Sequence, residues 1–232
     1  MPSIIEAARS QVGRKFLTGI TGLFLILFII MHLAGNLTVF GDAEAMNRYS
    51  LTLHNFGWLL WVARIGLALT FILHAWIGLS IWLRRRKARP DSYSVYSSKG
   101  EPSKQGLSSR SMAFTGVVLL IFLVIHLNTF AFGETDSVWI DGQQASDLKS
   151  LVLDTFQSPL YAFGYTFVML LLGAHLGHGF WSALTSLTMK RKKLSSVIYT
   201  VGVIFAILMA VGFLFIPLYI YFTGGTGALI SG

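Results

Sequence analysis

The 232-residue chain contains no cysteine. This absence excludes disulfides, thiolate metal sites, thioether-linked haem and any iron–sulfur cluster held by the chain itself. Histidine is therefore the only strong side-chain ligand left for a transition metal, and the chain has six of them.

Charged residues are also scarce, at 12% of the chain against about 25% in soluble domains. The apolar residues are not dispersed but collected into five stretches, and Arg64 is the only charged residue inside them. Each stretch supplies the roughly 20 residues that a helix needs to cross the hydrocarbon core. The sequence predicts membrane spans at about residues 16–40, 56–83, 111–132, 158–189 and 195–222.

The positive charges are distributed unevenly between the ends of these spans. Of the 18 lysines and arginines, 15 lie before the first span, in the segment 84–110, or in the segment 190–193. The other two loops, 41–54 and 133–157, hold seven carboxylates against Arg48 and Lys149. Because cytoplasmic loops collect lysine and arginine, we expect the N-terminus inside and the C-terminus outside. The fold predicted is an all-α integral membrane protein, a single domain over 1–232 with five transmembrane helices.

The basic segments flank spans and do not form a soluble domain, so a nucleic-acid partner is not expected. The cytoplasmic loop 84–110 is polar, is punctuated by proline and glycine, and lacks helical periodicity. Such a segment is typical of a linker, and on this side of the membrane it could also serve as a docking surface for a soluble partner.

Five of the six histidines lie inside the predicted spans. An ionisable residue within a membrane is a functional-site hypothesis by default, although a single one can simply pack against a neighbouring carbonyl. Here at least one histidine occurs on each of four spans, which favours a shared role. Two histidines on facing helices are what bis-histidine haem ligation requires. The five are His32, His74, His126, His175 and His178.

Depth along the helices sorts these histidines into an outer and an inner set. His32 lies 17 residues after Lys15, and His126 lies 16 after Arg110. At 1.5 Å per residue both are roughly 24–26 Å from the inner ends of their helices. The sequence therefore predicts an outer haem between His32 and His126.

The inner set is less uniquely defined by depth. His74 lies 10 residues before Arg84, roughly 15 Å from the inner end. His178 and His175 lie 12 and 15 residues before Lys190, roughly 18 and 22 Å from that end. An inner haem is expected between His74 and one of these two, and depth alone slightly favours His178.

Four segments around these histidines together resemble a known family. They read TGLFLILFIIMH ending at His32, HAWIGLSIW from His74, TGVVLLIFLVIHL around His126, and HLGHGFWSAL from His175. In this order and on five spans, they resemble the two-haem cytochrome b subunits of succinate dehydrogenases and fumarate reductases. The resemblance covers roughly residues 10–220.

The resemblance selects one of the two inner alternatives. In that family the ligand on the fourth span is the histidine four residues before a glycine that is followed by a large apolar and an aromatic residue. Here His175 has that position, ahead of Gly179, Phe180 and Trp181. The resemblance thus implies two haems b, ligated by His32 with His126 and by His74 with His175, and leaves His178 as the alternate.

The resemblance also implies the assembly around the chain. A flavoprotein subunit would oxidise succinate or reduce fumarate, and an iron–sulfur subunit would exchange electrons with this anchor. The anchor would pass them to or from a quinone, usually menaquinone in the two-haem type, within a bacterial inner membrane. The chain would be an enzyme subunit that binds no dicarboxylate itself, and a higher oligomer of the complex is left open.

Three outer residues are further candidates for cofactor binding. Arg64 would neutralise a propionate of the outer haem, or else snorkel to the outer interface. His54 and Asn55 would serve proton exchange with an outer quinone, since histidine titrates near physiological pH. The alternative for these two is a helix cap or a contact with lipid headgroups.

Three inner residues are candidates of the same kind. Ser10, Arg14 and Lys15 would contact a propionate or an inner quinone, although positive-inside anchoring accounts for the two basic residues without a ligand. Glycines near the histidines would admit a flat macrocycle, or simply allow close helix packing. They are Gly19, Gly22, Gly35, Gly78, Gly116, Gly173, Gly177 and Gly179.

Two other functions are compatible with membrane histidines. One is the cytochrome b subunit of a different quinone-linked enzyme, such as a nitrate reductase or a hydrogenase. The other is a haem-free transporter or proton channel with a histidine relay, in which the histidines need not share a depth.

Overall fold

The structure is a computed structural model that describes residues 10–88, 111–187 and 192–224. Five of its helices are long and apolar enough to cross a membrane. They are α2 (Gln11–Leu37), α4 (Trp58–Lys87), α6 (Met112–His126) with its π-helical extension η2 (Leu127–Ala131), α8 (Pro159–Leu187) and α9 (Lys192–Thr223). The predicted all-α bundle of five membrane-spanning helices is confirmed.

Some predicted boundaries are corrected. Helix α2 begins five residues before position 16, because the Ser10 hydroxyl caps it by accepting a hydrogen bond from the Gly13 amide at 3.0 Å. Helix α4 continues past 83 through Arg84–Lys87, so the predicted loop at 84–110 was wrong in its first residues. A helix C-terminus stabilises cations, so this basic run prolongs the helix. Positions 89–110 and 188–191 lie outside the described residues.

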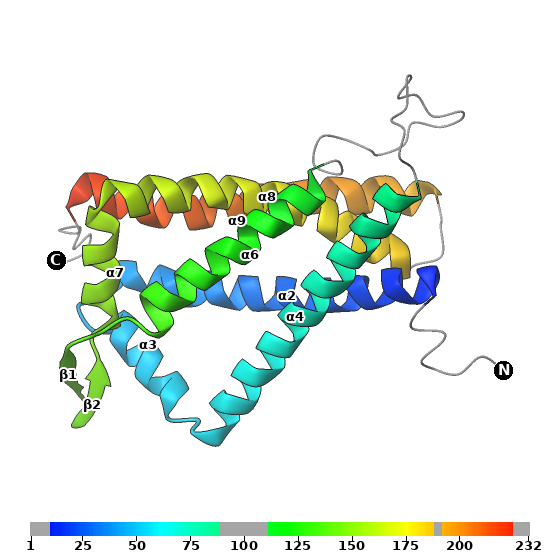
Figure 1. Ribbon diagram of the computed structural model, residues 1–232. Helices are drawn as coiled ribbons and strands as arrows, with labels where there is room; N and C mark the ends of the chain where they lie inside the picture. The colour runs from blue at the N-terminus through cyan, green and yellow to red at the C-terminus, as the bar shows by residue number, and fades with distance from the viewer. Residues whose placement is uncertain (1–9, 89–110, 188–191, 225–232) are drawn as a thin grey trace.

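Helices α8 and α9 pack closely through small residues. Helices α8 and α9 run side by side, with α2 beside them, while α4 and α6 cross this layer obliquely (Figure 1). A β-carbon built on Gly173 would lie 2.8 Å from Cβ of Ala210, and one on Gly177 would lie 3.3 Å from Cβ of Ala206. Glycine at these two positions lets the helix backbones approach closely, as is common between membrane helices.

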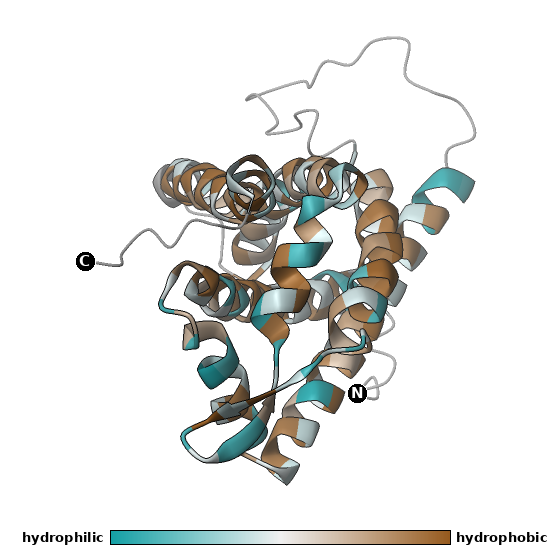
Figure 2. Cartoon of the chain, turned by 90° about the vertical axis from the view of Figure 1, so that its left-hand side faces the viewer, coloured by the Kyte–Doolittle hydropathy of each residue, from teal (hydrophilic) through white to brown (hydrophobic). Residues whose placement is uncertain are grey.

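A compact cap covers one end of the bundle, the end predicted to face outward. It consists of η1 (Thr38–Phe40), α3 (Ala45–His54), the antiparallel hairpin β1 (Ser137–Ile140) and β2 (Gln143–Ser146), and α7 (Leu148–Gln157). The hairpin turns at Asp141 and Gly142, both with positive φ, as a two-residue type I′ turn requires. Coloured by hydropathy, the long helices are largely brown, whereas teal residues gather in this cap (Figure 2).

Asn47 holds the two cap helices together. Its amide donates to the Asp147 carboxylate at 2.8 Å and accepts from the Lys149 amide at 2.9 Å, and its side chain is only 4% exposed. Burial raises the pKa of Asp147, but hydrogen bonds from Asn47 and Ser150 outweigh it, so the pKa lies below its ordinary value. Asn47 therefore provides the buried polar link between α3 and α7.

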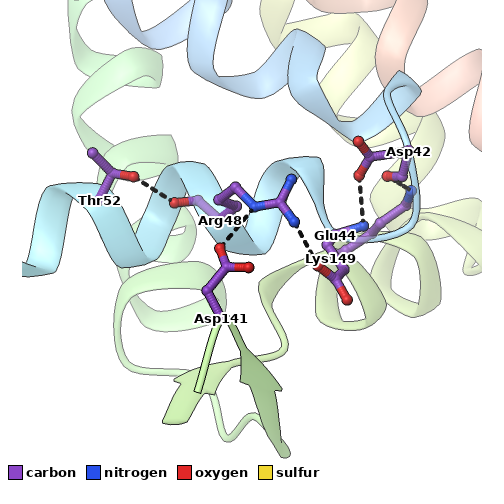
Figure 3. A network of polar contacts seen from close by, with 6 residues as sticks. All are labelled: Asp42, Glu44, Arg48, Thr52, Asp141 and Lys149. Atoms are coloured by element: carbon purple, nitrogen blue, oxygen red, sulfur yellow. Dashed lines mark hydrogen bonds and ion pairs between the residues drawn. The ribbon is translucent and has the colours of Figure 1, made fainter. Parts of the chain in front are cut away.

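A second, exposed network lies around Arg48. Its guanidinium contacts Glu44 at 2.7 Å and Asp141 at 3.4 Å, while the Lys149 ammonium donates to the Asp42 carbonyl at 2.8 Å (Figure 3). These contacts join α3 to the hairpin turn, and α7 to the segment before α3. Exposed ion pairs contribute little stability, so this network adds less than the buried amide.

Candidate functional site

Two of the histidines on the long helices meet near the capped end of the bundle. His32 on α2 faces His126 at the end of α6, with ring centroids 5.7 Å apart and planes nearly perpendicular. The Phe28 ring stacks on His32 at 5.2 Å, and the Phe122 ring stacks on His126 at 5.6 Å. Aromatic side chains therefore surround this outer pair and hold both rings in place.

A second pair lies farther from the cap. His74 on α4 faces His175 on α8, with ring centroids 6.5 Å apart and planes inclined by 70°. His178 lies next to Trp181 instead, at 5.7 Å between ring centroids. The structure thus brings His175 and not His178 opposite His74, against the slight preference from depth.

Both separations suit a metal ion between two imidazoles. A metal–nitrogen bond to imidazole is about 2 Å long, so two rings bound on opposite sides of one ion have centroids roughly 6 Å apart. The described residues contain no group of three or more His, Cys, Asp or Glu that could enclose an ion. A pair of imidazoles fits best an ion whose remaining ligands come from a macrocycle.

A threonine on a neighbouring helix contacts each inner histidine. Thr21 Oγ1 on α2 lies 3.2 Å from His74 Nδ1, and Thr115 Oγ1 on α6 lies 3.1 Å from His175 Nδ1. Because Nδ1 is engaged in both rings, Nε2 is the nitrogen left to bind a metal. Neither threonine is among the candidate residues predicted from the sequence.

Glycines follow both threonines and lie against the same rings. A β-carbon on Gly22 would lie 3.3 Å from His74 Cε1, and one on Gly116 would lie 3.5 Å from His175 Cε1. Among the candidate glycines, these two border histidines. Gly19, Gly173 and Gly177 pack against other helices, Gly35 packs against Tyr49, and β-carbons on Gly78 and Gly179 would meet no atom within 4 Å.

The sequence carries a signal for this arrangement in the form of a repeat. A Thr-Gly dipeptide stands eleven residues before His32 and again eleven residues before His126. His74 and His175 are each followed four residues later by a glycine. Equivalent positions of the two halves therefore face each other in both pairs, as in a bundle with approximate twofold symmetry.

The outer pair differs from the inner one in its polar contacts. His126 Nδ1 is buried without a hydrogen-bond partner within the described structure, and so is the Tyr165 hydroxyl. Tyr165 on α8 lies 6.1 Å from His126 between ring centroids and is 8% exposed. Sequence reasoning missed Tyr165, because a tyrosine in an apolar span gives no distinctive signal.

The remaining outer candidates lie at the surface. Arg64 is exposed, with its guanidinium carbon 5.3 Å from the centroid of Trp61, one turn nearer the outer end of α4. This geometry fits snorkelling toward the interface with a cation–π contact. His54 is the last residue of α3, its Nδ1 2.8 Å from the Ser50 carbonyl, and Asn55 is the C-cap. The structure therefore gives these last two residues a capping role.

The inner candidates lie at the opposite end of α2. Ser10 caps the helix, and Lys15 is exposed. Arg14 is partly buried and donates to the Ser80 hydroxyl at 3.4 Å, which links α2 to α4. These contacts bring none of the three residues onto a histidine.

Comparisons of the chain with models of known protein families, with curated proteins and with solved structures find no match.

Proposed function

We propose that the chain is the cytochrome b anchor of a succinate:quinone oxidoreductase and holds two haems b. His32 and His126 would bind the outer haem iron, and His74 and His175 the inner one. The anchor would carry electrons between an iron–sulfur subunit and a membrane quinone, with menaquinone as the expected type. A flavoprotein subunit would handle succinate or fumarate, and the complex would lie in a bacterial inner membrane.

One observation supports this proposal above all others. Four helices place four histidines as two facing pairs, with ring centroids 5.7 and 6.5 Å apart. Buried histidines with a packing role alone have no reason to meet in pairs at two levels of one bundle. The four sequence segments that resemble two-haem cytochrome b subunits contain these same histidines.

The donor set fits haem b. Imidazole is the only strong ligand the chain offers, and a pair of imidazoles supplies both axial positions of a haem iron. Haem iron bound in this way would exchange single electrons with neighbouring centres. The chain would hold the rings in orientation through Phe28, Phe122, Thr21 and Thr115, and would exclude water through its apolar helices.

The pairing also bears on the alternatives. A haem-free proton relay would work with histidines staggered along a path, whereas these lie face to face in two separate pairs. A cytochrome b subunit of another quinone-linked enzyme shares the same haem chemistry, so the soluble partners distinguish it from an anchor for succinate oxidation.

Two measurements test the proposal in sequence. A reduced-minus-oxidised spectrum of the purified full-length protein should show low-spin haem b bands, with about two haems per chain. Absence of these bands would refute the haem proposal. Co-purification from the native membrane should then recover a flavoprotein and an iron–sulfur protein with succinate:quinone activity, whereas recovery of a molybdenum or nickel enzyme would reassign the chain to another oxidoreductase.

A further inference from the structure

The inner histidines share an arrangement that the outer ones lack. We propose that Thr21 and Thr115 are positioning residues that accept a hydrogen bond from Nδ1–H of His74 and His175, and so direct both Nε2 lone pairs toward one metal. The inference rests on the proposed haem ligation for its functional meaning. The tautomer itself is a property of this chain alone.

The direction of each hydrogen bond follows from the threonine hydroxyls. Thr21 Oγ1 lies 2.8 Å from the Leu17 carbonyl, and Thr115 Oγ1 lies 3.1 Å from the Ser111 carbonyl. A hydroxyl has a single proton, and a carbonyl oxygen only accepts, so each threonine donates to its own helix. The oxygen is then left as an acceptor, and we assign the histidine Nδ1 3.1–3.2 Å away as the donor.

A neutral imidazole protonated on Nδ1 carries its lone pair on Nε2. That nitrogen is then the one able to bind iron.

The same contacts to a histidine ring occur twice and are made by equivalent residues. Thr21 and Gly22 on α2 contact His74, and Thr115 and Gly116 on α6 contact His175. The small glycine lets the ring lie close to the helix that carries the threonine. Repetition in both halves of the bundle indicates a requirement of the site and argues against an accident of packing.

For a bound haem, the hydrogen bond would strengthen the ligand. A ring that donates its Nδ1–H to an acceptor is more basic at Nε2 and favours the oxidised iron. Loss of the acceptor should therefore raise the midpoint potential of the inner haem. The outer pair, where His126 Nδ1 has no partner in the described structure, should not respond.

The first test uses the haem-free full-length chain labelled with ¹⁵N-histidine. Nitrogen chemical shifts should show His74 and His175 protonated at Nδ1, with signals assigned by their loss in His74→Gln and His175→Gln. Thr21→Val should shift His74 toward a mixture of tautomers, Thr115→Val should do so for His175, and the serine variants should restore the wild-type shifts. Protonation of Nε2 in the wild type, or unchanged shifts in both valine variants, would overturn the inference.

The second test uses the haem-loaded complex. Potentiometric titration of Thr21→Val and Thr115→Val should show a raised potential for one haem only, with recovery in Thr21→Ser and Thr115→Ser. Thr70→Val is the matched control, since Thr70 on α4 also donates to its own helix, at 2.8 Å, but in an exposed hydrogen bond. If the protein binds no haem, the proposed function fails, whereas the tautomer measurement still decides the role of the threonines.

Discussion

The inner and outer histidine pairs are assembled from equivalent positions of two halves, yet their surroundings differ. Threonine hydroxyls engage Nδ1 of both inner rings, whereas His126 in the outer pair is packed among aromatic rings and its Nδ1 lacks a partner in the described structure. The outer pair lies close to the polar cap, whereas the inner pair lies farther from the cap, between the long helices. One ring arrangement can therefore be stabilised either by hydrogen bonds or by aromatic packing.

The largest expected effect comes from removing a ligand from one pair. His175→Gln should lose the inner haem and His126→Gln the outer one, each with about half of the haem b absorbance, because an iron with one imidazole is held weakly. Spectra of the purified variants measure this loss. His178→Gln is the control and should keep both haems; loss of the inner haem in this variant but not in His175→Gln would exchange the ligand assignment.

A bulky residue beside an inner ring should disturb that pair alone. A β-carbon on Gly22 would already be 3.3 Å from His74, so Gly22→Leu should push the ring away, at about 1–3 kcal/mol of strain, and weaken inner haem binding. Haem content and the potential of each haem report this change. Gly66→Leu is the control, since a β-carbon there meets no atom within 4 Å. Equal loss in both variants would show that the effect is not local.

The cap should matter to the outer pair more than to the inner one. Asn47→Leu removes buried hydrogen bonds to Asp147 and Lys149 and should lower the local stability of α3 and α7 by about 2 kcal/mol. Hydrogen exchange of the amides in these helices measures it. Arg48→Leu removes only exposed ion pairs and should cost less than about 1 kcal/mol. If Arg48→Leu cost more stability than Asn47→Leu, the surface network and not the buried amide would be the main link in the cap.

As the pH falls, the cap should lose stability before the membrane-spanning helices do. The pKa of Asp147 is lowered in the folded chain, so its contribution to stability is complete above the unfolded value, about 4, and is lost as the pH falls through the folded value. Exchange of the α7 amides should therefore accelerate below about pH 4. Asp147→Asn should flatten this dependence, and an unchanged profile in that variant would assign the acid response to another group.

The smallest expected effect concerns Tyr165. Its buried hydroxyl has at most a weak contact with Thr129, so Tyr165→Phe should leave stability unchanged or raise it by about 1 kcal/mol, with both haem spectra preserved. Thermal denaturation followed by haem absorbance measures both properties. A change in the absorbance of the outer haem alone would show that Tyr165 acts on His126. The outer pair would then also depend on a polar neighbour, as the inner pair does.

Much of the fold was accessible from the sequence, and the exceptions have physical reasons. Span lengths depend on hydropathy, and the fourth span, predicted to begin at about residue 158, agrees with the start of α8 at Pro159. The cap was missed because its helices are short and amphipathic, although Asp147 as an N-cap and the Asp141-Gly142 turn were local signals. The end of α4 was missed because Arg84–Lys87 look like a loop by charge.

The sequence by itself determined that the chain spans a membrane five times and that histidine is its only strong metal ligand, since both follow from composition along the chain. The resemblance in the sequence already named His175 as the partner of His74, whereas only the tertiary structure decided that the two rings face each other and that Thr21 and Thr115 lie on them. Which side of a helix meets a neighbour depends on its rotation about its own axis. Packing against the other helices sets that rotation, and depth along the chain does not contain it.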